Sequence, residues 1–339
     1  MATPREDDPA EALRRLTIGY QVSQAVHVVA TLGIPDLLAD GSRTVDELAS
    51  STASDPDALY RLLRALASIG ILHEEPGRAF SLTEIGDGLR SDAPESLAGW
   101  ALYVGRPYYW NAWAHLLHSV QTGENAFRSV HGTTVWEYRA DHPEESAIFD
   151  GAMTSLTRRV NSALLESYDF ERFGTVVDVG GGHGALLAAL LTAYPATQGV
   201  LFDQPHVVAL ARDLLGAAGV ADRCRVVGGS FFESVPEGGD AYLLKAILHD
   251  WEDAEAVAIL EACRRAMRGD AMLLVVERIL GPPNEGAAAK LSDLNMLVGP
   301  GGRERTLDDF AALFEAAGFR LEDETPTRSD LSILAATPR

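Results

Sequence analysis

The stretch TVVDVGGGHGALLAALLTAY, Thr175 to Tyr194, decides the fold. It opens with a β-branched run, passes through a group of glycines and becomes an Ala/Leu-rich segment without Gly or Pro. This order predicts a strand, a tight turn and a helix. Because glycines have no Cβ, the backbone of the turn can approach a ligand closely, and the helix start directs unpaired N–H groups toward it. The stretch therefore predicts a corner that binds a polar ligand.

The glycines alone leave the ligand open. Gly180, Gly182 and Ala185 also satisfy the GxGxxG/A pattern of nicotinamide and flavin enzymes. Two acidic residues narrow the choice of ligand. Asp178 closes the strand before the glycines, and Asp203 ends the next apolar run, GVLFD. The second acid has the spacing expected for binding a ribose diol.

Further motifs follow in a fixed order, and with them the chain resembles the S-adenosylmethionine (SAM)-dependent small-molecule O-methyltransferases. This is the family of plant phenylpropanoid enzymes and of bacterial enzymes that tailor polyketides and antibiotics. The matching stretches, which span nearly the whole chain, are DVGGGHG, FDQPHV, GGSFFESVP, LLKAILHDW and GPGGRERTLDDFAALFEAAGF. The resemblance implies O-methylation in secondary metabolism, with SAM as cofactor and S-adenosylhomocysteine as product; we expect no metal.

The C-terminal half predicts an α/β domain. Strand-like runs alternate with helical stretches, which is typical of a parallel sheet with helices on both faces. The runs are TVVDV, GVLFD, CRVVGG, DAYLLKAIL, AMLLVVE, RLEDET and LSILAA. Only PTRSD separates the last two, and so short a link requires an antiparallel pair. This ending fits the Rossmann-like class I methyltransferase fold and is unlike most dehydrogenases.

The N-terminal part predicts an α-helical winged-helix domain. Residues 12–33 are apolar on more than one side, so we expect one long helix buried between neighbours. Thr44 and Glu47 form a capping box, a further helix opens at Ser54 or Asp55, and ILHEEPGRAFSLTE reads as a hairpin. Residues 1–95 carry eight Arg against sixteen Asp and Glu, a net charge of −8, which disfavours a DNA-reading role. The resemblance implies instead a dimerisation domain and hence a homodimer.

Length and charge bound the rest of the organisation. At 339 residues the chain exceeds a usual single domain. We expect a winged-helix dimerisation domain at 1–95, a helical linker at 96–173 that contributes to the substrate pocket, and a SAM-binding Rossmann-like methyltransferase domain at 174–339. A net charge of −21 disfavours nucleic acid and anionic membranes as partners. Because no signal-like or bilayer-length apolar run occurs, we expect a cytoplasmic protein.

Aromatic residues crowd the helical stretch between 94 and 173. Any single ring is explained by core packing, but as a set the rings suit a pocket for a flat aromatic small molecule, the expected substrate. Bacterial relatives also contact substrate at the positions matching DLNML. The substrate candidates are Trp100, Tyr109, Phe149, Met153, Asn295 and Met296.

A histidine is the expected catalytic base. A phenol with a pKa of about 10 is only ~0.1% ionised at neutral pH, whereas an imidazole with a pKa of about 6.5 is free to take its proton. His249 follows the fourth strand run, where the resemblance places the family's base; the alternative is a structural histidine capped by Asp250 or Trp251. The resemblance also implies two carboxylates that orient the ring, Glu277 and Glu304. For Glu304 an exposed charge is the alternative.

The resemblance assigns the cofactor contacts to the rim of the sheet, where the strands end. Departing from many relatives, this chain has Ser230 where they have Asp before the aromatic residue, so we expect somewhat weaker SAM binding. The expected cofactor residues are Asp178, Gly180, Gly181, Gly182, Asp203, Ser230, Phe231 and Lys245.

Other functions stay open at this point. Some bacterial relatives keep SAM as a structural cation and catalyse hydroxylation, decarboxylation or pericyclic steps, and N-methylation is chemically close to O-methylation. A SAM-sensing winged-helix regulator and a nicotinamide oxidoreductase are further alternatives. The sequence fixes neither the substrate nor the position that is methylated.

Overall fold

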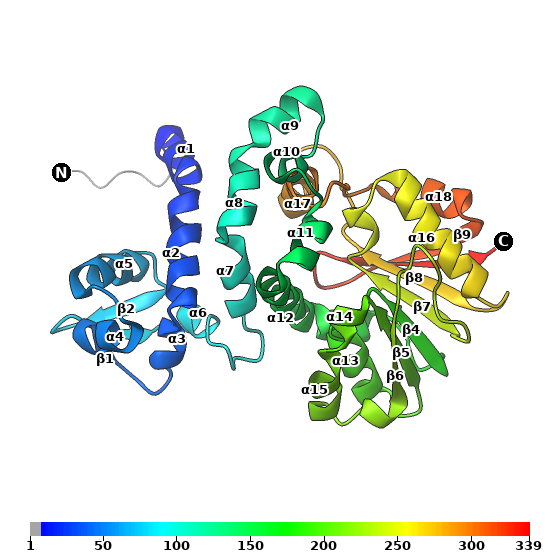
Figure 1. The fold of residues 1–339 in the computed structure, drawn as a ribbon, viewed down its shortest axis with the longest axis horizontal. Coiled ribbons are helices and arrows are strands. Elements are labelled where there is room, and N and C mark those ends of the chain that lie inside the picture. The colour runs from blue at the N-terminus through cyan, green and yellow to red at the C-terminus, as the bar shows by residue number, and fades with distance from the viewer. Residues whose placement is uncertain (1–7) are drawn as a thin grey trace. The chain divides into compact units, whose positions relative to one another are not determined.

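The computed structural model describes residues 8–339, which form two compact units (Figure 1). The first unit comprises the described residues up to Trp110 together with Ala147–Leu156. The second comprises Asn111–Ser146 and Thr157–Arg339. The three functional segments expected at 1–95, 96–173 and 174–339 stay a prediction.

The first unit has the predicted helices and wing. Thr44 and Glu47 form the predicted capping box at the start of α4, and Asp55 caps α5. The three short strands pair antiparallel in the order β1-β3-β2. The elements are α1 Pro9–Thr17, α2 Gly19–Thr31, α3 Ile34–Leu37, β1 Arg43–Thr44, α4 Val45–Thr52, α5 Pro56–Ser68, β2 Leu72–Glu75, β3 Ala79–Leu82, α6 Glu84–Asp87 and α7 Ala98–Val104.

The predicted single buried helix at 12–33 is wrong in two respects. The chain leaves helical geometry at Ile18, so two helices, α1 and α2, replace one. Neither is buried along its length: Leu13, Leu16 and Tyr20 are 63%, 79% and 57% exposed. These three apolar side chains thus have no cover within the described part of this unit, whereas Val29 of α2 is buried in its core.

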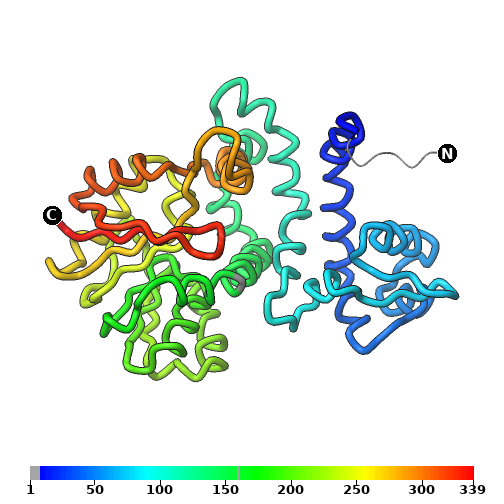
Figure 2. The backbone as a smooth tube through the Cα atoms, turned by 180° about the vertical axis from the view of Figure 1, so that it is seen from behind, coloured from blue at the N-terminus to red at the C-terminus, as the bar shows by residue number. Residues whose placement is uncertain are grey.

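The second unit is built on a mostly parallel sheet. Its order is β6-β5-β4-β7-β8-β10-β9, in which β10 alone runs antiparallel to both neighbours. The predicted terminal antiparallel pair is therefore confirmed; it forms the orange-to-red hairpin of Figure 2. The strands are β4 Thr175–Val179, β5 Gln198–Asp203, β6 Cys224–Gly228, β7 Ala241–Lys245, β8 Met272–Glu277, β9 Phe319–Pro326 and β10 Ser332–Pro338.

Helices cover both faces of this sheet, as Figure 1 shows. One face packs on α13 and α15 through residues such as Leu187 and Leu215, and the other packs on α16 and α18 through Ile259 and Phe314. The helices from α8 onward are α8 Pro107–Ala114, α9 Leu116–Thr122, α10 Ala126–His131, α11 Val135–Asp141, α12 Pro143–Ser167, α13 Ala185–Ala193, α14 Pro205–Val208, α15 Ala211–Ala217, α16 Asp253–Ala266, α17 Ala287–Val298 and α18 Leu307–Ala316, with 3-10 turns η1 Ala221–Arg223 and η2 Leu248–Asp250.

This topology gathers polar side chains on one rim. Asp203, Lys245 and Glu277 are the last residues of β5, β7 and β8, and Asp178 is the last but one of β4. Because parallel strands end at the same edge, the rim carries the glycine turn and the ends of these strands together. Among the described residues, no helix combines the length and the apolar character needed to cross a bilayer.

Candidate active site

The turn between β4 and α13 requires glycine. Gly180 and Gly182 have φ values of 73° and 59°, in the left-handed region that other residues rarely adopt. A Cβ at Gly180 would overlap the Ile247 side chain, and one at Gly181 would lie 2.5 Å from Asp178 Oδ2. Gly180 and Gly181 therefore leave no room for a side chain, whereas Gly182, with open space beside it, is required by its backbone conformation.

Asp178 is a buried carboxylate under this turn. It is 2% exposed, and its Oδ2 has no hydrogen-bond partner in the described chain. Burial raises the pKa of Asp178 to about 7, against a smaller opposing effect of the nearby Lys245. Burial likewise lowers the pKa of Lys245. An orphaned buried carboxylate beside a glycine turn fits a cationic ligand such as SAM, whose positive charge would compensate the anion.

The other expected cofactor residues lie around the same turn. Asp203 Oδ2 accepts a hydrogen bond from the Gly182 amide at 2.8 Å, so the carboxylate is fixed relative to the glycines. Burial raises the pKa of Asp203. Phe231 lies 3.7 Å from a Cβ position at Gly180 and contacts Trp251 edge-on at 5.9 Å. Ser230 Oγ accepts from the Phe232 amide at 3.3 Å, so its hydroxyl faces its own turn.

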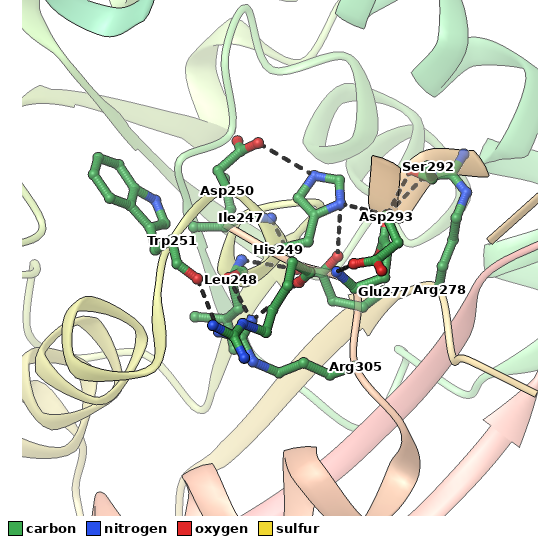
Figure 3. Close-up of polar contacts among 12 residues, drawn as sticks. Ile247, Leu248, His249, Asp250, Trp251, Glu277, Arg278, Ser292, Asp293 and Arg305 are labelled. Atoms are coloured by element: carbon green, nitrogen blue, oxygen red, sulfur yellow. Dashed lines mark hydrogen bonds and ion pairs between the residues drawn. The ribbon is translucent and has the colours of Figure 1, made fainter. Parts of the chain in front are cut away.

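His249 lies among three carboxylates on the rim. Its Nδ1 donates to Glu304 Oε1 at 3.0 Å and lies 3.7 Å from Glu277 Oε2, while its Nε2 lies 3.6 Å from Asp250 Oδ1. Figure 3 shows the imidazole between Asp250 on one side and Glu277 on the other. Glu277 is held by the backbone amides of Ile247 and Leu248, at 3.0 and 2.8 Å.

These carboxylates determine the charge of the imidazole. Burial by itself lowers the pKa of His249, but the charges of Glu277, Asp250 and Glu304 outweigh it and raise the pKa to about 10. The expectation of an imidazole near 6.5, uncharged at neutral pH, is therefore wrong for the ligand-free protein. Burial raises the pKa of Glu277 and raises that of Asp250 to about 6. For Glu304, burial is outweighed by hydrogen bonds from His249 and Ser292, which lower its pKa.

The alternative interpretation of Glu304 as an exposed charge is wrong, since the residue is 2% exposed. Its backbone amide donates to Asp293 Oδ1 at 2.9 Å, and its Oε1 accepts from Ser292 Oγ at 2.6 Å. Both partners are on α17. Glu304 is thus held through its backbone and its side chain.

Arg305 links the 301–305 loop to the 248–251 turn through hydrogen bonds. Its guanidinium is buried and donates to the backbone oxygens of Leu248 and Trp251, each at 2.8 Å, as Figure 3 shows. Gly302 packs on the same turn so closely that a Cβ would overlap the His249 carbonyl. The 301–305 loop and the 248–251 turn therefore form one packed assembly.

The sequence named Asp250 only as a cap of a structural histidine, and it did not indicate Ser292, Asp293 or Arg305. The motifs LLKAILHDW and GPGGRERT contain Asp250 and Arg305. Nothing in the spacing of Ser292 and Asp293 on α17 could have shown that they reach Glu304 across a loop.

The substrate candidates fall in both units. Within the first, Trp100, Tyr109 and Phe149 gather around Tyr103, with ring centroids 4.9 to 5.6 Å away. Met153 lies on α12 one turn after Phe149. Asn295 and the buried Met296 lie on α17 in the second unit. The roles of all six stay a prediction.

The base cluster also has a spacing that suits a metal. One ligand atom each from His249, Glu277 and Glu304 lie within 4.8 Å of one another, and Glu277 Oε2 and Glu304 Oε2 have no hydrogen-bond partner among the described residues. The expectation that the protein uses no metal stays a prediction.

Comparison with known proteins gives the family. Residues 15–91 match the O-methyltransferase dimerisation domain, and residues 113–320 match the O-methyltransferase domain. The chain is 46% identical to the phenazine O-methyltransferase PhzM of Lysobacter antibioticus, covering 96% of this chain and 95% of that protein. It is 40% identical to the 8-amino-8-demethylriboflavin N,N-dimethyltransferase of Streptomyces davaonensis, covering 93% and 91%.

A solved structure shows the cofactor in a relative. The O-methyltransferase NcsB1 from neocarzinostatin biosynthesis, in complex with SAM and 2-hydroxy-5-methyl naphthoic acid, superimposes with a TM-score of 0.80. It is 36% identical, covering 94% of this chain and 96% of that one. With two family models matched in order and relatives aligned over nearly their full lengths, the chain belongs to the SAM-dependent O-methyltransferases that carry an N-terminal dimerisation domain.

Proposed function

We propose that this enzyme methylates a hydroxyl of an aromatic natural product, with His249 as the base. The observation that carries the proposal is the buried imidazole held at 3.0 Å by Glu304 on the rim that also bears the glycine turn. The relatives named for phenazine and naphthoate chemistry support an aromatic acceptor.

The residues on the rim form a proposed SAM site and a proposed site of proton removal. Asp178, Gly180 to Gly182, Asp203 and Phe231 would hold SAM, and Ser230 and Lys245 lie beside them. When bound, SAM supplies an electrophilic methyl group on a sulfonium. The protein must then orient the acceptor oxygen and remove its proton, so positioning carries much of the rate.

The carboxylates around His249 favour the charge that proton removal creates. They raise its pKa, so the imidazole is a stronger base than a free histidine and is protonated in the ligand-free protein at neutral pH. That proton must leave to solvent as the phenol binds. The neutral imidazole can then take the phenol proton while the oxygen is methylated. Glu277 and Glu304 stabilise the imidazolium that results.

The test is transfer of a deuterated methyl group from labelled SAM to a panel of hydroxylated naphthoates and phenazines, followed by mass spectrometry. We expect labelled product from at least one phenol. His249→Ala should lower kcat by ~10² to 10⁴, the range of general base catalysis. His73→Ala, on the exposed wing, is the matched control and should keep full activity. SAM binding without label transfer to any acceptor would support a SAM-dependent reaction other than methylation.

N-methylation is a second candidate, because one relative is named as an N,N-dimethyltransferase. Paired acceptors that differ only in a hydroxyl or an amino group distinguish the two. An amine acceptor needs less help from a base, so His249→Ala would then lose little activity.

A further inference from the structure

We propose that Ser292 is a positioning residue for methyl transfer: through Glu304 Oε1, its hydroxyl fixes the orientation of the His249 imidazole and the site of its proton. The inference rests on the proposed role of His249 as base. Ser292 does not reach the imidazole itself and acts only through Glu304.

One carboxylate oxygen is the shared acceptor. Glu304 Oε1 accepts hydrogen bonds from the Ser292 hydroxyl at 2.6 Å and from the His249 Nδ1–H at 3.0 Å, and it lies 4.0 Å from Arg278 Nη1. The other oxygen, Oε2, has no hydrogen-bond partner in the described residues. The side-chain orientation of Glu304 is therefore determined by what binds to Oε1.

The position of Glu304 has a second support on the same helix. The Asp293 carboxylate accepts the Glu304 backbone amide at 2.9 Å, which fixes the backbone but leaves the side-chain torsions free. Ser292, the residue before it on α17, supplies the side-chain contact. Figure 3 shows Ser292 and Asp293 on the side of the imidazole opposite Asp250.

Fixing Glu304 determines which nitrogen is the base. A carboxylate that accepts from Nδ1 keeps a proton on that nitrogen, which leaves Nε2 as the atom that exchanges a proton with the acceptor. The hydroxyl also keeps Glu304 ionised, because its hydrogen bond favours the charged form. Loss of the hydroxyl would leave Glu304 Oε1 with the His249 Nδ1–H, so the carboxylate would be held less firmly.

The pH dependence follows from the groups around the imidazole. The charge of Glu304 helps to raise the pKa of His249, so a Glu304 that is held less firmly should lower that pKa. Because the acid limb of a base-dependent profile follows the pKa of the base, this limb should move to lower pH in the variant. The other charged groups of this region are the same in the parent and the variant. They are Arg139, Lys245, Asp250, Glu277, Arg278 and Asp293.

The experiment compares Ser292→Ala and Ser292→Thr with the parent enzyme across pH 5.5 to 9. For Ser292→Ala we expect kcat to fall by roughly tenfold, the effect of one hydrogen bond to a charged group, with KM values for both substrates nearly unchanged. The acid limb of the kcat profile should move to lower pH. Ser292→Thr keeps a hydroxyl and should restore both. Ser167→Ala, which removes a helical hydroxyl bonded only to the Ala163 carbonyl, is the matched control.

A second readout does not depend on turnover. In ¹⁵N-labelled protein, His249 nitrogen shifts should show Nδ1 protonated across this range in the parent and a changed titration in Ser292→Ala. If the parent transfers no methyl group, the proposed function fails while this measurement still tests Ser292. A folded Ser292→Ala with parental kcat at every pH and an identical His249 titration would overturn the inference.

Discussion

Asp178 shows how one residue prepares this protein for a cationic ligand. The carboxyl is buried, its Oδ2 has no hydrogen bond within the described structure, and its pKa is raised to about 7. The ligand-free fold therefore carries an unfavourable charge above neutral pH. A bound cation would remove that penalty. The buried carboxylate thus lowers the stability of the ligand-free protein and increases its affinity for a cation.

Asp178→Asn should consequently stabilise the ligand-free protein at pH 8 and weaken SAM binding. Because the folded-state pKa lies above the ordinary 3.8, folding favours the protonated carboxyl, and stability is lost as pH rises from 3.8 through about 7. The gain from Asn should be near zero at pH 4 and reach at most about 4 kcal/mol above pH 7. Chemical denaturation across pH checks it; a gain that is the same at pH 4 and pH 8 would contradict the assignment.

His249 marks the limit of what a sequence reveals about a residue. Its place after a rim strand and its family motif predicted a candidate base, but not its charge. The charge depends on Glu277, Asp250 and Glu304, which arrive from a neighbouring strand, the same turn and a distant loop. Only packing shows that all three lie within 4 Å of one ring.

Removal of metal should not change turnover. The spacing of His249, Glu277 and Glu304 would accept a divalent ion, but an ion on Nδ1 would replace the proton that Glu304 holds there. We therefore expect dialysis against EDTA to leave kcat within about twofold, and added Zn²⁺ not to raise it. Loss of activity on chelation with recovery on adding one metal would contradict this expectation.

At the scale of elements, the site depends on the packing of the 301–305 loop against the 248–251 turn. Arg305 caps the carbonyls of Leu248 and Trp251, and Gly302 allows the backbones to touch. Glu304 lies between these two contacts in the chain. The orientation of His249 relative to Glu304 thus depends on loop packing.

Gly302→Ala should disrupt this packing. The added Cβ would overlap the backbone of the His249 turn, so the two segments must separate. Overpacking typically costs about 1–3 kcal/mol, and we expect kcat to fall by at least tenfold from misplacement of His249. Gly281→Ala, where a Cβ meets nothing within 4 Å, is the control for kcat and melting temperature. Equal behaviour of the two variants would exclude the proposed role of the loop.

The elements themselves were largely predictable. Alternating runs gave the strands, and the five-residue link PTRSD required the antiparallel hairpin of β9 and β10. The break at Ile18 and the exposure of α1 could not be predicted. Apolar spacing shows which side of a helix is suited to burial, but not which segment or partner buries it. The reach of α17 to Glu304 depends on a loop path that periodicity does not encode.

At the scale of the whole molecule, the match of residues 15–91 to the dimerisation domain supports a homodimer. Leu13, Leu16 and Tyr20 on α1 and α2 are exposed apolar side chains that we expect the dimer to bury. The net charge of −21 opposes non-specific association.

Leu16→Asp should therefore weaken the dimer. A charge placed in an apolar interface is costly to bury, so we expect a shift toward monomer and a lower melting temperature. Light scattering coupled to gel filtration measures the mass directly. Leu210→Asp, at a leucine that is 55% exposed in the second unit, is the matched control. A Leu16→Asp protein as dimeric as the control would contradict the assignment of this surface.

The proposed proton removal by His249 is tested most directly by measuring how much His249 contributes to kcat for acceptors of different acidity. In a series of phenols whose pKa falls from about 10 to about 7, the ratio of kcat for the parent and His249→Ala should shrink as the phenol ionises without help. We predict a large ratio for the weakest acid and a ratio near one for the strongest. A ratio that stays constant across the series would mean that His249 does something other than take the proton.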